Sequence, residues 1–62
     1  MEKFWVRAVG KRELPHQART VAVYGTVEDA RDYAYNYMQR PFGITVFQVF
    51  DRDMNELESF EA

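Results

Sequence analysis

The chain of 62 residues has no cysteine, one histidine, two prolines and three glycines. Without cysteine there is no disulfide framework, no thiol nucleophile and no thiolate metal site, and one histidine does not build a zinc site by itself. No apolar run approaches the ~20 residues that span a bilayer, and the start, "MEKF", lacks the apolar core of a signal peptide. We therefore expect a single cytoplasmic domain over residues 1–62, with no membrane contact, no metal and no cofactor.

Side chains that catalyse reactions are also scarce. The only serine is Ser59, and His16 has Glu13 as its nearest acidic neighbour in the sequence. General acid–base and nucleophilic catalysis need two or three groups within reach of one another in a pocket, and a thin core offers little pocket. The sequence predicts a protein that is not an enzyme.

Residues 51–56, "DRDMNE", begin like a calcium loop, with oxygen-bearing side chains at alternating positions. The sixth position is Glu56, where the tight turn needs glycine, and the twelfth is Ala62, where a bidentate glutamate belongs. This segment is typical of an acidic hairpin turn, which agrees with the expectation of no metal.

The abundant residues are apolar, at 47%, with aromatics at 16%, as in a packed core. Alternation with a period of two predicts strands over Phe4–Val9 and Arg19–Tyr24, joined by a loop of residues 10–18. Two further strands, Ile44–Phe50 and Glu56–Phe60, flank the turn at 51–55.

The period changes after Gly25. Thr26 is placed to cap a helix by accepting from the amide of Asp29, and Glu28 adds a second negative charge to the first turn. An apolar stripe at helical spacing follows, and Pro41 with Gly43 ends the helix near Arg40. We expect a single α+β domain of ββαββ order, with one helix packed on a four-stranded antiparallel or mixed sheet.

The strand at Ile44–Phe50 carries large apolar residues on both faces, whereas one helix of three turns covers about one sheet face. The helix-facing set is expected to be Phe4, Val6, Val21, Val23, Val46 and Phe50. The second face then carries Trp5, Val9, Tyr24, Phe47, Val49 and Phe60, interleaved with Arg7, Thr20, Thr45 and Glu58. A β-bulge near Gln48 would exchange the faces of the last two strands.

Two arrangements would cover the second face. The loop at residues 10–18 folds over it with Leu14, or another molecule binds there. A patch rich in Trp, Tyr and Phe with a charged rim has the composition of a protein-binding surface.

The segment from Arg19 to Glu58, with the helix start "TVEDARDYA" and the strand "GITVFQVF", resembles small phage-encoded anti-CRISPR inhibitor proteins. Such inhibitors block surfaces on their targets without catalysis. The resemblance implies a module that occludes a site on a larger protein, and it implies no role for any single residue.

The net charge of −2 is unevenly distributed. Residues 1–25 carry five basic and two acidic side chains, and residues 26–62 carry three basic and eight acidic ones. We expect a partner to bind either the aromatic face at Trp5, Tyr24 and Phe47, or an acidic surface that imitates nucleic-acid phosphates to a basic target. That acidic surface comprises Glu28, Asp29, Asp32, Asp51, Asp53, Glu56 and Glu58.

Two alternatives stay open. The basic hairpin loop 10–19 predicts a small nucleic-acid-binding domain, with a patch made of Arg7, Lys11, Arg12 and Arg19. A homodimer joined through the second sheet face or through an edge strand would instead make the aromatic residues structural. Both a monomer and a homodimer are consistent with the sequence.

Overall fold

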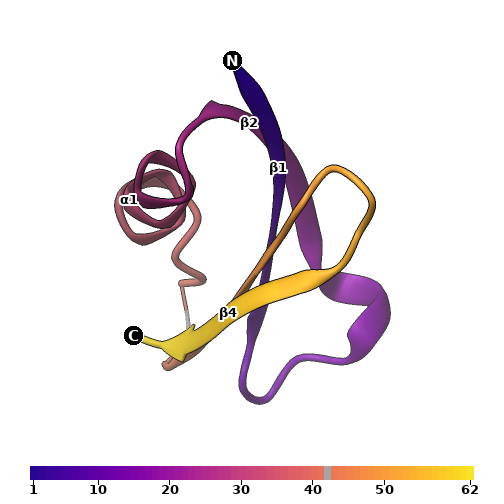
Figure 1. Cartoon of the computed structure of the whole chain (residues 1–62). Coiled ribbons are helices and arrows are strands. Elements are labelled where there is room, and N and C mark those ends of the chain that lie inside the picture. The colour runs from indigo at the N-terminus through magenta and orange to yellow at the C-terminus, as the bar shows by residue number, and fades with distance from the viewer. Residues whose placement is uncertain (42) are drawn as a thin grey trace.

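A computed structural model describes residues 1–41 and 43–62 (Figure 1). The elements in chain order are β1 (Glu2–Gly10), η1 (Pro15–Gln17), β2 (Arg19–Gly25), α1 (Val27–Tyr37), β3 (Thr45–Phe50) and β4 (Glu56–Glu61). The four strands form one antiparallel sheet of order β2-β1-β3-β4. Helix α1 lies to one side of the strands and packs against β1, β2 and β3. The predicted α+β fold of ββαββ order is confirmed.

Helix α1 begins where the sequence predicts. The Asp29 amide donates to Thr26 Oγ1 over 3.1 Å, and the Thr26 amide donates to Asp29 Oδ2 over 2.9 Å. These two bonds form a capping box, which satisfies donors at the helix start that have no partner within the helix. Within the described residues, no helix is long and apolar enough to cross a membrane.

The helix ends at Tyr37, earlier than the predicted end near Arg40. The Arg40 amide donates to Thr45 Oγ1 over 2.8 Å, so it does not continue the helical hydrogen-bond ladder. Pro41 also disfavours helical backbone at the residue before it. The same bond satisfies the hydroxyl of Thr45, which is the buried polar side chain of the described core.

The core lies between α1 and one face of the sheet. It contains Phe4, Val6 and Ala8 of β1, Ala30 and Ala34 of α1, Met38 after the helix, and Phe47 and Val49 of β3. Phe47 is fully buried, and its ring stacks on Phe60 with centroids 4.8 Å apart. The alanines of β1 and α1 leave room for this large ring.

The predicted faces of β3 and β4 are wrong. Phe47 and Val49 lie on the helix side, whereas Val46 and Phe50 lie on the other side. The cause is the register with β1, which pairs Val49 with Val6 and Phe47 with Ala8, both buried against α1. Three residues predicted for the face away from the helix belong to the helix side as well, namely Thr45, Glu58 and Phe60.

Candidate functional site

The face of the sheet that points away from α1, here called the open face, is built from alternate residues of the strands. Its central residues are Trp5, Arg7, Val9, Thr20, Ala22, Tyr24, Val46, Gln48 and Phe50. No α-helix of the described residues other than α1 exists to cover this face. Helix α1 packs on the opposite face of the sheet, so it does not cover the apolar side chains of the open face.

Trp5 is the centre of the open face. Its cross-strand partners are Phe50 of β3 and Ala22 of β2, so an aromatic pair stands beside a small residue. Both aromatic side chains are half-buried, and the ammonium of Lys3 lies 4.2 Å from the centroid of the Trp5 ring. Tyr24, opposite Lys3 on β2, is 60% exposed. The rings are supported by the strands beneath them and remain accessible.

The sequence predicts Phe47 beside Trp5 and Tyr24, whereas the structure puts Phe50 opposite Trp5. Phe47 is fully buried and presents nothing to a partner. Gln48 is the signal that would have found Phe50, because a polar residue in the middle of a strand marks the face that meets solvent. Val46 and Phe50 share the parity of Gln48 and therefore its face.

Arg7 sits on the open face two residues from Trp5 and is held in place. Its guanidinium donates to Gln48 Oε1 over 2.8 Å, and Gln48 Nε2 donates to Glu56 Oε1 over 2.8 Å. These bonds connect β1, β3 and β4 across the face. A cation positioned in this way loses little side-chain entropy when a partner binds it.

The loop between β1 and β2 does not cover the aromatic residues with Leu14, which is 60% exposed. Glu13 directs the loop elsewhere, because its carboxylate accepts from the Gly10 amide at 2.7 Å and from Arg40 at 2.8 and 3.1 Å. The hydrogen bonds from Arg40, and to a lesser extent the one from Gly10, lower the pKa of Glu13. The same bonds between Arg40 and Glu13 raise the pKa of Arg40. Of the two arrangements considered for this face, the one in which the loop covers it with Leu14 does not fit the exposed position of Leu14.

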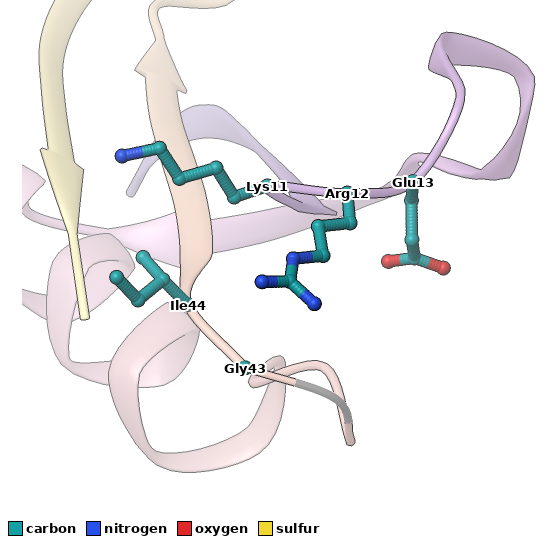
Figure 2. Close-up of a pocket in the computed structure, with 5 residues that line it drawn as sticks. All are labelled: Lys11, Arg12, Glu13, Gly43 and Ile44. Carbon is teal, nitrogen blue, oxygen red and sulfur yellow. The ribbon is translucent and has the colours of Figure 1, made fainter.

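The predicted basic patch is divided by the sheet. Arg7 lies on the open face, whereas Arg19 pairs with Ala8 and therefore shares the helix side. Lys11 lies 3.3 Å from Glu61, and Arg12 lines a groove with Gly43 and Ile44. Figure 2 shows the Arg12 guanidinium extending from the loop toward Gly43 while Lys11 extends in another direction. The four cations do not form one surface.

Four carboxylates of the predicted acidic surface accept hydrogen bonds within the chain, and one of them, Glu56, accepts from Gln48 Nε2. Asp29 caps α1, and Glu58 accepts two bonds from Arg31 at 2.9 and 2.7 Å, which raises the pKa of Arg31. Asp51 accepts from the amides of Asp53 and Asn55 and from the Asn55 side chain. These bonds lower the pKa of Asp51, and the bond from the Asn55 amide has the largest effect.

The remaining carboxylates are exposed. Glu28 and Asp32 lie on α1, and Asp53 lies in the turn before β4. Comparison of the chain with family models, with curated proteins and with solved structures finds no match.

Proposed function

We propose that this chain is a non-catalytic module that binds a larger protein through the open face and thereby occludes a site on it. The observation that carries the proposal is the aromatic pair of Trp5 and Phe50, with Arg7 beside it, on the sheet face opposite to the one that α1 covers. Trp, Tyr and Arg are the residue types that most often dominate binding energy at protein interfaces. Sequence resemblance to phage-encoded inhibitors supports the same mode of action.

The charges on the open face suggest the chemistry of the partner. Lys3 and Arg7 are cations beside aromatic rings, so the complementary surface combines an apolar patch with at least one carboxylate. A carboxylate of the partner would compete with Gln48 for the guanidinium of Arg7. The face is the surface of a sheet, a shape that fits a protein surface better than it encloses a small molecule.

The proposal is tested by capturing partners on immobilised protein and measuring the affinity of each captured protein. Trp5→Ala should weaken binding by ~2 kcal/mol or more, about a thirtyfold rise in Kd, with little dependence on salt. Tyr35→Ala is the matched control, because Tyr35 is also an exposed aromatic residue, at 54%, but lies on α1.

Two outcomes of the capture experiment are informative, and a gel-shift assay adds a third. A protein held by the wild type and by Tyr35→Ala, and lost with Trp5→Ala, supports the open face. Loss with the double variant Glu28→Lys and Asp32→Lys, and retention with Trp5→Ala, assigns binding to the acidic surface instead and contradicts the proposal. A gel shift of single-stranded nucleic acid, abolished by Lys11→Glu with Arg12→Glu, would favour the nucleic-acid alternative.

A further inference from the structure

The two edges of the sheet differ in how well they are protected from pairing with another strand. Edge strand β4 carries Glu56, Glu58 and Glu61, and its register with β3 is irregular between Val49 and Phe50. Charges and irregular pairing are the features that keep edge strands from adding further strands. Strand β4 is therefore a poor site for edge pairing.

Edge strand β2 lacks those features. It runs for seven residues, "RTVAVYG", with Arg19 as its one charged residue and no proline. Its pairing with β1 is continuous from Arg19 to Gly25, without a bulge. A long, regular and mainly apolar edge of this kind presents a row of backbone donors and acceptors to an incoming strand.

The apolar side chains of β2 are also incompletely covered. Val21 and Val23 point to the helix side, like their partners Val6 and Phe4, yet they remain half-buried while those partners are buried. Helix α1 thus leaves the outer part of this strand accessible. A strand added at the β2 edge would remove these two side chains from water.

We infer that two copies of this chain pair through β2, antiparallel, about a two-fold axis perpendicular to the sheet at Ala22. In this register Ala22 faces Ala22 of the second copy, and Val21 faces its Val23, so the apolar strip is self-complementary. Arg19 faces Gly25 of the second copy, so no like charges stand opposite each other. Any such two-fold arrangement uses one surface twice and closes at two copies.

The arrangement is sterically feasible. Helix α1 packs on β1, β2 and β3, which centres it near β1. In the dimer the two β1 strands are separated by both β2 strands, so they lie three strand spacings, about 14 Å, apart. The two copies of α1 are separated by a similar distance, which exceeds the 8–10 Å between packed helices, so they do not clash. The two Arg19 side chains lie about 20 Å apart along the strands, beyond the screening length at physiological salt.

This pairing goes beyond the proposed function and leaves the open face free. Because the two-fold axis keeps each face on its own side, the open faces of both copies form one surface on an eight-stranded sheet, and each copy contributes its Trp5. The result is a bivalent binding surface.

The first test is a disulfide across the two-fold axis, in a chain that has no other thiol. Ala22→Cys places two sulfurs on directly opposite residues, whose Cα atoms lie 4.5–5.5 Å apart in an antiparallel pair, within the range that a disulfide bridges. Thr20→Cys is the control on the same strand and face, because two Thr20 residues would lie about 13 Å apart. We expect rapid oxidation of Ala22→Cys to a covalent dimer and none for Thr20→Cys. Equal crosslinking of both variants, or of neither, would overturn the inference.

The second test measures solution mass by light scattering over a wide concentration range. The wild type should give a dimer, Ala22→Lys and Ala22→Glu should each give monomers, and an equimolar mixture of the two should restore the dimer through opposite charges at the axis. A wild type that stays monomeric contradicts the inference. A mass that grows without limit also contradicts it, because it indicates that β2 of one copy pairs with β4 of the next and that the assembly does not close. Trp5→Ala should still dimerise, so loss of partner binding and loss of dimerisation are separate results.

Discussion

Replacement of Phe47 with alanine should remove most of the stability of this domain, whereas replacement of Phe50 should not. Phe47 is fully buried and stacked on Phe60, and Phe50 is half-buried on the open face. Truncation of a buried Phe to Ala costs ~3–5 kcal/mol, which includes the cavity that remains. A domain of this length has a free energy of unfolding of about 3–9 kcal/mol in total. Phe50→Ala should cost about 1 kcal/mol, a typical value for a partly exposed site.

Urea unfolding followed by far-ultraviolet circular dichroism measures both variants with a signal that does not depend on Trp5. With a slope of about 1 kcal/mol per molar urea, Phe47→Ala should lower the midpoint by ~3–5 M or leave the chain unfolded without urea. The lowering for Phe50→Ala should be near 1 M. Equal shifts for the two variants, or a larger shift for Phe50→Ala, would refute the assignment of β3 faces and with it the open face.

Three further perturbations test the local structure. Gly25→Ala should destabilise the fold by ~1–3 kcal/mol in thermal unfolding. The reasons are that Gly25 has φ +141° and that a Cβ there would lie 2.5 Å from Asp29 Oδ2. An unchanged melting temperature would contradict this geometry. Thr26→Ala should cost ~1 kcal/mol through loss of the helix cap, and Thr26→Ser should recover most of it. Hydrogen bonds, chiefly those from Arg40, hold the pKa of Glu13 below its ordinary value of 4.5. The ionised Glu13 therefore stabilises the fold fully above pH 4.5, and this contribution is lost as the pH falls below that value. The urea midpoint of the wild type should therefore fall between pH 5 and pH 3 more steeply than that of Glu13→Gln, and identical slopes would show that the Arg40 pair is not formed.

The elements of this fold can be predicted from local sequence features. Thr26 and Asp29 are three residues apart, so the capping box and the helix start depend on neighbours in the chain. Turn chemistry around Asp51 likewise acts within five residues, and it locates the two C-terminal strands. These features operate before any tertiary contact forms, which is why the order ββαββ is confirmed.

The faces of β3 could not be predicted from its apolar residues, because both parities of "TVFQVF" carry large side chains. The choice depends on the register with β1, which brings Phe47 opposite Ala8, 39 residues earlier. The end of α1 depends in the same way on the hydroxyl of Thr45, and the loop position depends on a bond between Glu13 and Arg40. The partners that end α1 and hold the loop have no local signature in a single sequence, and the one local sign of the β3 faces is the polar Gln48.

Strand β1 pairs on one side with β2, its neighbour in the chain, and on the other side with β3. The two hairpins close short loops, whereas the β1–β3 pairing joins Trp5 to Phe50 and closes most of the chain. Closing a loop over this separation costs conformational entropy, and the contacts that offset this cost form only when the two strands pair. We therefore expect the β1–β3 pairing to form last and to limit the folding rate. Strands β1 and β2 and helix α1 all precede β3 in the chain, and until β3 pairs, the edge of β1 that β3 covers in the native sheet has no partner. The folding chain is thus most prone to aggregate in the interval before β3 pairs with β1.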